Sequence, residues 1–242
     1  MVEQLRLAAL AVALLPALAR AGDEPAMGAH MDADPWYARV LVDRLEWQDA
    51  ADGPAAAWEV DAWAGRDAAR VLLRAEGERT DGDTGENSVE LLGWRPVAGF
   101  WNLVAGLRQD FEPDTPRTYL AFGVEGLAPG WVHLEATGYY GERGQLAAGL
   151  EADVELLLTN RLILVPEVEL QAFARDDEVN GIGAGLGAVR AGLRLRYEIR
   201  REFAPYAGLE WAGKLGGTAD LARAAGERVR EARWVAGLRV WF

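Results

Sequence analysis

The chain of 242 residues contains no cysteine. This absence excludes disulfides, thiolate metal sites and cysteine nucleophiles. Only two histidines are present, His30 and His133, so a zinc site built from several imidazoles is also excluded. The one serine, Ser88, would have to pair with one of these histidines to form a hydrolase triad. The residues that carry most enzyme chemistry are therefore scarce, and we expect that the protein is not an enzyme.

Long hydrophobic runs are also lacking. No stretch approaches the roughly 18 uninterrupted apolar residues of a membrane-spanning helix. An apolar run over residues 7–18 ends in Ala19, Arg20 and Ala21, a pattern typical of a secretory signal peptide, which we place at residues 1–21. Residues 22–35 are polar and bounded by proline, and we expect a short disordered leader there. The mature chain is thus expected to be exported without a helical anchor.

Basic residues are in the minority. Acidic residues outnumber them by 38 to 25, and the formal net charge is −13. A chain this acidic is a poor general partner for nucleic acid, whose affinity for proteins comes mostly from the neutralisation of phosphates. Its charge would instead attract cations. Hydrophobic residues make up 50% of the chain, too many for a disordered protein.

From Trp36 onward, apolar and polar residues alternate with a period of two, which indicates β-strands with one apolar and one polar face. In residues 146–158, for example, Leu146 and Leu150 share one face, and Glu151 lies on the other. The pattern predicts about twelve strands of roughly 9–11 residues, the length that crosses a bilayer when tilted. The predicted strands lie at about residues 37–47, 56–65, 70–79, 88–96, 100–110, 117–126, 131–141, 146–158, 162–172, 189–198, 203–213 and 232–242.

The connections between these strands alternate between short and long. Residues 66–69 and 159–161 form short connections, whereas residues 48–55, 79–88 and 214–231 form long polar ones. Short turns on one side and long loops on the other are the plan of bacterial outer-membrane barrels. An even number of strands then places both termini on the short-turn side, which is periplasmic in such barrels.

Aromatic residues mark the ends of the predicted strands. Most of the ten tryptophans lie there, as Trp36, Trp47 and Trp131 do, and membrane interfaces select such amphipathic rings. The chain ends in Phe242, on the apolar face of an alternating last strand. A terminal phenylalanine in this position resembles the signal by which the barrel assembly machinery recognises outer-membrane barrels.

The alternation alone is also compatible with an exported soluble β-sandwich or a lipocalin-like barrel, whose apolar face lies inside. Here the apolar face is nearly all Leu, Ala and Val, and the opposite face carries rows of charge. Aliphatic residues facing lipid and charges facing a wet lumen explain this pattern more simply. We therefore predict an all-β fold, a transmembrane antiparallel up-and-down β-barrel of about 12 strands over residues 36–242, in contact with outer-membrane lipid.

The charges of the inner face are sorted by sign along the chain, and neighbouring antiparallel strands bring such side chains within reach of one another. One interpretation is a lumenal salt-bridge network that stiffens or plugs the barrel, and the other is a pathway that attracts cations. Both can hold together. The charged residues concerned are Glu151, Asp153, Glu155, Glu167, Glu169, Arg190, Arg194, Arg196, Arg233 and Arg239.

Two groups of residues are candidates for binding a metal. His133 and Glu135 share one face of a predicted strand, about 7 Å apart along the chain direction, and an imidazole beside a carboxylate suits a divalent transition metal. In the leader, Met27, His30 and Met31 cluster together. Thioethers suit Cu(I), and imidazole suits Cu(II). The alternatives are a hydrogen-bonded lumenal histidine and a chance clustering in the leader.

Several segments resemble the outer-membrane copper-resistance protein B family, in order and spacing, over nearly the whole chain from Met31. The resemblance implies a β-barrel in the outer membrane of Gram-negative bacteria that works beside a periplasmic multicopper oxidase in copper resistance. It also implies a Met- and His-rich leader that binds copper, of which Met27, His30 and Met31 are what this sequence retains. The segments are VLVDRLEWQDA (40–50), EGERTDG (76–82), FGVEGLAPGWVHLEATGYYGERG (122–144), ELLLTNRLILVPEVELQAF (155–173), GLRLRYEIRREFAPYAGLEW (192–211), GGTADLAR (216–223) and residues 235–242.

These observations predict a barrel that takes part in copper resistance by binding or passing copper ions, which would be held only weakly and transiently. A pathway must release what it binds. The alternatives are a general small-solute channel that uses the arginine row for selectivity, an enzyme in the barrel wall, and a docking barrel for a periplasmic multicopper oxidase.

Overall fold

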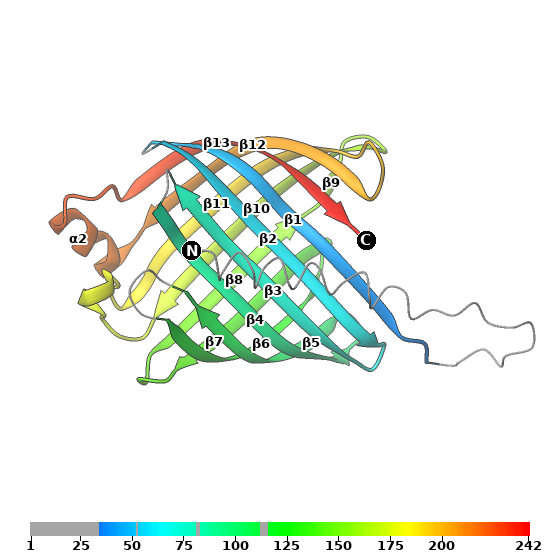
Figure 1. The fold of residues 1–242 in the computed structure, drawn as a ribbon, viewed down its shortest axis with the longest axis horizontal. Helices are drawn as coiled ribbons and strands as arrows, with labels where there is room; N and C mark the ends of the chain where they lie inside the picture. Colours follow the sequence, from blue (N-terminus) through cyan, green and yellow to red (C-terminus); the bar gives the residue numbers. More distant parts are fainter. Residues whose placement is uncertain (1–33, 52, 81–82, 112–115) are drawn as a thin grey trace, which may run out of the picture.

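The computed structural model describes residues 34–51, 53–80, 83–111 and 116–242. The predicted signal peptide and nearly all of the leader, with Met27, His30 and Met31, lie outside the described residues. Within the described part the chain forms a single antiparallel sheet that closes on itself (Figure 1). The strands are β1 (Tyr37–Ala50), β2 (Gly53–Arg66), β3 (Ala69–Thr80), β4 (Asp83–Ala98), β5 (Trp101–Asp110), β6 (Arg117–Ala128), β7 (Val132–Gly141), β8 (Leu146–Val154), β9 (Leu156–Leu157), β10 (Leu162–Phe173), β11 (Gly185–Tyr197), β12 (Phe203–Lys214) and β13 (Arg230–Trp241).

β8 and β9 are two pieces of one strand of the wall. Both pair with β10 in a continuous register, Asp153 opposite Glu167 and Leu156 opposite Leu164. Pro166 of β10 lies between these two pairings and has no N–H to donate. The wall described here therefore has twelve antiparallel strands, which confirms the predicted fold class.

The barrel closes between its first and last strands. β13 pairs with β1 along its length, and Val40 and Phe242 exchange two backbone hydrogen bonds, of 3.1 Å and 2.9 Å. Closure leaves no strand of the sheet at a free edge, as a bilayer requires. The start of β1 and the end of β13 thus lie at the same end of the barrel, which also carries the shorter turns.

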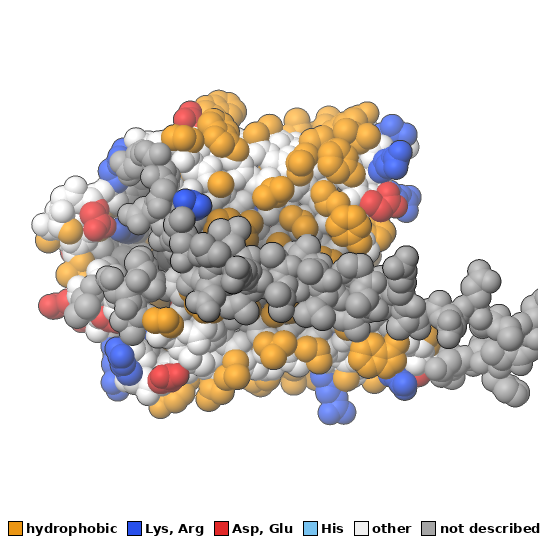
Figure 2. Space-filling model, viewed as in Figure 1, with side chains coloured by type: hydrophobic (Ala, Val, Ile, Leu, Met, Phe, Trp, Pro, Cys, Tyr) orange, Lys and Arg blue, Asp and Glu red, His pale blue; other side chains and the backbone are white. Residues whose placement is uncertain are grey.

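The period-two pattern divides the side chains between two faces. Apolar side chains such as Leu45, Leu120, Phe122 and Leu193 are exposed on the outer wall. Figure 2 shows hydrophobic side chains spread over the middle of the barrel, with charged side chains mostly toward its two ends. This is the arrangement of a wall that faces hydrocarbon.

Part of the lumen is apolar, which the sequence analysis did not predict. Leu72, Leu92, Val104 and Ala121, from four neighbouring strands, form a buried cluster, and the partly buried ring of Trp94 packs against it among others. These residues lie on the same face of their strands as the charged residues do. The inner face of the barrel is therefore only partly charged. The cluster occupies part of the lumen along β3 to β6.

Two of the predicted long loops are wrong. The segment 48–55 is mostly strand, because β1 extends to Ala50 and β2 begins at Gly53. The segment 79–88 likewise lies largely in β3 and β4. Residues 79–88 are polar on both faces, and β2 begins with glycine, proline and alanines, so the alternation that marks a strand stops before the strand does.

Two short helices lie in the connections at the long-loop end. A 3-10 helix, η1, covers Glu178–Asn180, and α2 covers Gly216–Ala224. α2 buries Thr218, whose hydroxyl accepts a hydrogen bond from the backbone N–H of Gly183 at 3.0 Å. The connection predicted as a loop over 214–231 therefore contains a helix that is packed on the neighbouring connection. No helix in the described ranges is long and apolar enough to cross a membrane.

Candidate functional site: a charged lumen

A cavity of about 1310 Å³ occupies the lumen. Its lining includes fifteen carboxylates, nine arginines and one histidine, so carboxylates are in clear excess. The carboxylates are Asp43, Glu59, Asp61, Glu76, Glu78, Glu90, Asp110, Glu125, Glu135, Glu151, Asp153, Glu155, Glu167, Glu169 and Glu210. The arginines are Arg39, Arg44, Arg74, Arg108, Arg117, Arg190, Arg196, Arg233 and Arg239.

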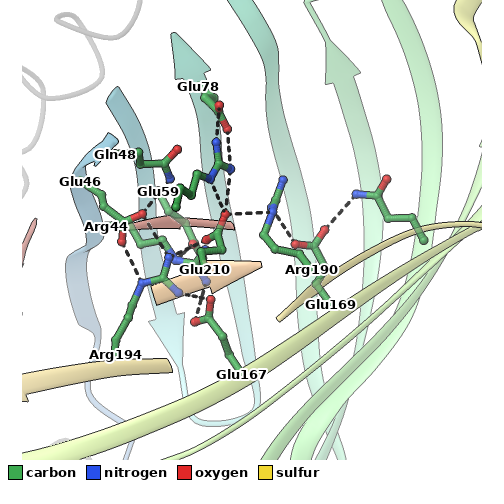
Figure 3. Close-up of polar contacts among 12 residues, drawn as sticks. Arg44, Glu46, Gln48, Glu59, Glu78, Glu167, Glu169, Arg190, Arg194 and Glu210 are labelled. Carbon is green, nitrogen blue, oxygen red and sulfur yellow. Dashed lines mark hydrogen bonds and ion pairs between the residues drawn. The ribbon is translucent and has the colours of Figure 1, made fainter. Parts of the chain in front are cut away.

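Arg194 of β11 is the centre of the most buried ion-pair cluster. Its side chain is 6% exposed, and it contacts Glu46 of β1 at 2.8 Å, Glu210 of β12 at 2.8 Å and Glu167 of β10. Figure 3 shows the three carboxylates converging on this guanidinium. Gln48 donates a further hydrogen bond to Glu46 at 2.8 Å. The cluster therefore joins four strands from both sides of the barrel seam.

Glu210 connects this cluster to two more arginines. Arg233 of β13 donates to it at 2.8 Å, and Nε of Arg190 lies 3.6 Å from it. Arg233 also reaches Glu78 of β3 at 2.9 Å, past β1 and β2. Arg44 of β1 joins Glu59 of β2 at 3.1 Å and Glu167 at 3.0 Å. Two of these contacts, Arg233 with Glu78 and Arg44 with Glu167, join strands that are not neighbours in the wall, whereas the others join adjacent strands.

A second cluster lies along β3 to β7. Arg74 of β3 pairs with Glu125 of β6 at 2.6 Å, with Glu135 of β7, and with Asp61 of β2 at 3.6 Å. The indole N–H of Trp94 donates to Glu125 at 2.6 Å. Arg74 therefore reaches from β3, past β4 and β5, to two carboxylates on β6 and β7.

Arg108 of β5 organises the neighbouring polar groups. It contacts Asp110 at 2.6 Å, Glu76 at 3.2 Å and Glu90 at 3.3 Å, and the Tyr139 hydroxyl donates to Glu90 at 3.0 Å. Ser88, the one serine, donates to Glu76 at 2.8 Å. This serine therefore belongs to the charge network, and the contacts of the described residues do not pair it with His133.

Four carboxylates form a row across neighbouring strands. Glu125, Glu135, Glu151 and Glu169 lie directly opposite one another on β6, β7, β8 and β10. Opposed residues on antiparallel strands have Cβ atoms about 5 Å apart, so like charges in such a row repel. Arg74 compensates the first two, and Arg190, at 2.8 Å, compensates Glu169.

Glu151 is the member of the row that no arginine contacts directly, although the charge of Arg44 acts on it over a longer distance. Its carboxylate has no hydrogen bond or ion pair among the described residues, and it lies between Glu135 and Glu169. Three carboxylates side by side, the middle one without an ion pair, make this sector of the wall acidic. A cation that enters the lumen is therefore attracted to this sector.

His133 faces the lumen from β7, as predicted, but its carboxylate neighbour differs from the predicted one. Its Nδ1 lies 3.8 Å from Asp153 of the adjoining strand, and its side chain is 73% exposed. Glu135 turns instead to Arg74. In the described parts of the chain no group of three or more His, Asp or Glu residues is arranged to hold a metal ion. The sector around His133 thus offers one imidazole and one carboxylate.

The remaining predicted network residues also lie in the lumen. Arg196 pairs with Glu155 at 2.6 Å, and Arg239 pairs with Asp43 at 2.5 Å. Several central residues were missed by the sequence analysis, although they lie on the polar face of alternating segments. They are Arg44, Glu46, Arg74, Arg108 and Glu210.

A closed, lipid-facing barrel around a charged lumen defines the class of the protein: an outer-membrane β-barrel. Two porins of known structure share the fold. The NanC porin aligns with a TM-score of 0.56 and 11% identity over 84% of this chain and 99% of that one. The KdgM porin aligns with a TM-score of 0.51 and 12% identity over 85% and 99%.

The chain belongs to the copper resistance protein B family. The family model described as Copper resistance protein B precursor (CopB) matches residues 36–242. The chain is 52% identical over 202 residues to the Copper resistance protein B homolog of Pseudomonas syringae pv. tomato, and 45% identical over 203 residues to Copper resistance protein B of Escherichia coli. Each alignment covers 84% of this chain and 69% of the relative. The predicted family is thereby confirmed.

Proposed function

We propose that the barrel lets copper ions cross the outer membrane through its lumen, as its part in copper resistance. The observation that carries this proposal is the carboxylate row, in which Glu151 lies between Glu135 and Glu169 and forms no ion pair among the described residues. Such a carboxylate attracts a cation and holds it briefly. Binding stays weak, because a pathway must release the ion as readily as it takes it up. The role is passive and needs no catalytic residue.

His133 and Asp153 are proposed as a second transient position, at the short-turn end. An imidazole next to a carboxylate suits a divalent transition metal. With one nitrogen and one carboxylate, and with the imidazole largely exposed, the position exchanges its ion readily. Glu135 contributes through the carboxylate row rather than as a direct partner of His133.

The donors of the lumen favour Cu(II) over Cu(I). The three methionines of the chain, Met1, Met27 and Met31, all precede β1, so the lumen offers carboxylate and imidazole groups but no thioether. Thioethers select Cu(I), whereas imidazole and oxygen donors suit Cu(II). We propose that Met27, His30 and Met31 of the leader bind copper separately from the lumen.

We propose that the short-turn end faces the periplasm, with both termini. This orientation is the usual one for outer-membrane barrels. It would place the leader where a periplasmic multicopper oxidase could receive or deliver copper. It would also place Phe242, which is exposed on the outer face, where the barrel assembly machinery meets the last strand.

The test is copper uptake into liposomes that contain the mature protein and enclose a copper-sensitive dye. Replacing Glu151 by Gln (Glu151→Gln) removes one charge, and a charge interaction of about 1 kcal/mol corresponds to an about fivefold lower initial rate with Cu(II). Glu142→Gln, in an exposed turn outside the lumen, is the matched control and should leave the rate unchanged. Equal rates for wild type and Glu151→Gln would contradict the proposal.

A general small-solute channel is the second candidate, because the fold is shared with two porins. An anion pathway along the arginines is not favoured, since Arg194, Arg196, Arg233 and Arg239 are each tied to a carboxylate. Swelling of proteoliposomes in neutral sugars separates the candidates. Rapid sugar entry that Glu151→Gln leaves unchanged, together with equal copper uptake, would favour the general channel.

A further inference from the structure

Three exposed arginines lie together at the short-turn end of the barrel. Arg161 is in the connection between β9 and β10, and Arg200 and Arg201 are in the connection between β11 and β12. The two connections adjoin, because β10 pairs with β11 and the backbone N–H of Glu198 donates to the carbonyl of Arg161 at 2.8 Å. We call Arg161, Arg200 and Arg201 the arginine patch.

The backbone that carries the patch is well fixed. Arg200 and Phe203 exchange two backbone hydrogen bonds of 3.2 Å each, and the indole N–H of Trp241 donates to the carbonyl of Arg201 at 2.7 Å. The guanidinium groups, in contrast, have no hydrogen bond or ion pair with any described residue. Each therefore presents a full set of N–H donors in the planar geometry that binds phosphate oxygens two at a time.

Apolar side chains of the outer wall continue up to the patch. Leu157, Leu158, Tyr197, Ile199 and Phe203 are all exposed, and they lie within a few residues of the arginines on the same elements. The lipid-facing belt therefore ends where the patch begins. Arginines at this level keep their stems on the apolar surface and their charged heads among the lipid headgroups.

The charge of the patch is only partly offset. Glu198 and Glu202 lie in the same connection, yet neither is within ion-pair distance of an arginine of the patch. At the opposite end the exposed Arg175 is followed directly by Asp176 and by two further acidic residues. An anion is therefore attracted to the short-turn end more strongly than to the long-loop end.

We propose that the arginine patch binds the phosphate headgroup of an anionic phospholipid, whose acyl chains lie on the adjoining apolar belt. A lipid satisfies both features at once, since its phosphate takes the guanidinium donors and its chains cover the exposed leucines. A soluble anion would bind the guanidinium donors but would leave the apolar belt uncovered. The inference rests on the barrel spanning a membrane and not on copper passage; the proposed orientation only assigns the site to the periplasmic leaflet.

The experiment is native mass spectrometry of the mature protein in detergent, with added cardiolipin or phosphatidylethanolamine. Wild type should retain cardiolipin and hold little phosphatidylethanolamine. The triple variant Arg161→Gln, Arg200→Gln and Arg201→Gln should retain at least about tenfold less cardiolipin, since it loses all three cationic groups that would hold the phosphate. The corresponding triple lysine variant keeps the charge but loses the two-point geometry, so its retention should be intermediate.

A matched control separates the site from net charge. Arg79, Arg143 and Arg175 are exposed at the long-loop end, and replacing all three by Gln removes the same charge. This variant should retain cardiolipin like wild type. Equal losses in both glutamine variants, or no loss in either, would overturn the proposal. Displacement of cardiolipin by an excess of inorganic phosphate would also overturn it, because the patch would then be a site for soluble anions.

Discussion

Arg44 of β1 and Glu167 of β10 form an ion pair of 3.0 Å across the lumen, although 123 residues separate them in the chain. β11, β12 and β13 lie between their strands in the wall, so the two side chains meet only when the barrel is closed. Glu167 binds Arg194 as well. Charge contacts of this kind tie distant strands together and limit the space through which a solute can pass.

Removal of Arg194 should destabilise the barrel strongly. Arg194→Ala leaves Glu46, Glu167 and Glu210 without their common partner, and loss of one member of a buried ion pair costs about 3–5 kcal/mol. The free energy of unfolding, measured by tryptophan fluorescence in urea, should fall by that amount. Arg223→Ala, which removes an exposed partner of Asp220, serves as the control and should cost less than about 1 kcal/mol.

Removal of Arg74 should make the lumen more selective for cations. Arg74→Gln frees the carboxylates of Glu125 and Glu135, so the row gains uncompensated negative charge. The permeability ratio of K⁺ to Cl⁻, taken from reversal potentials in planar bilayers, should rise, whereas Glu151→Gln should lower it. The conclusion that the row sets selectivity would fail if both variants shifted the ratio in the same direction.

Replacement of His133 should affect copper without affecting other ions. His133→Ala removes the imidazole beside Asp153 and leaves every carboxylate of the row in place. Initial uptake of Cu(II) into liposomes should fall a few-fold, and K⁺ conductance should stay the same. His30→Ala, in the leader, tests the second predicted group, and it should lower copper retained after dialysis while leaving uptake through the lumen unchanged.

Phe242 should matter for assembly more than for stability. Its side chain is 76% exposed on the outer face, whereas its backbone exchanges hydrogen bonds with Val40 that any residue can make. Phe242→Ala should therefore lower the amount of folded barrel in outer-membrane fractions and leave the urea midpoint of refolded protein nearly unchanged. A shift of the midpoint as large as that of Arg194→Ala would assign the residue a structural role instead.

The strands were predictable because one apolar face recurs at every second residue, and all twelve predicted strands overlap observed ones. The pattern does not report where a strand ends once the alternation stops, and it therefore placed residues 48–55 and 79–88 in loops. It also carries no signal for α2, whose contacts are with a neighbouring connection. The buried apolar cluster around Leu92 was not predicted for a related reason, since an apolar residue on the polar face of a strand interrupts the alternation.

The candidate site was predictable as a set of charges but not as a set of pairs. Glu151, Glu167 and Arg194 were assigned to the lumen from alternation alone. The partner of each depends on which strands face one another across the closed barrel, and that follows from the register at the seam rather than from local sequence. Arg74 shows this well, because its carboxylate partners on β6 and β7 are separated from it by at least two strands.

The break between β8 and β9 at Glu155 lowers the local stability of the barrel wall. The pairing of β8 and β9 with β10 is otherwise continuous, but here Pro166 offers no donor and two residues interrupt the pairing. Opening of the backbone costs least where the fewest ladder bonds must break. Amide hydrogens around Glu155 should accordingly exchange with heavy water sooner than those in the middle of β8, because the backbone opens there at a lower cost in free energy.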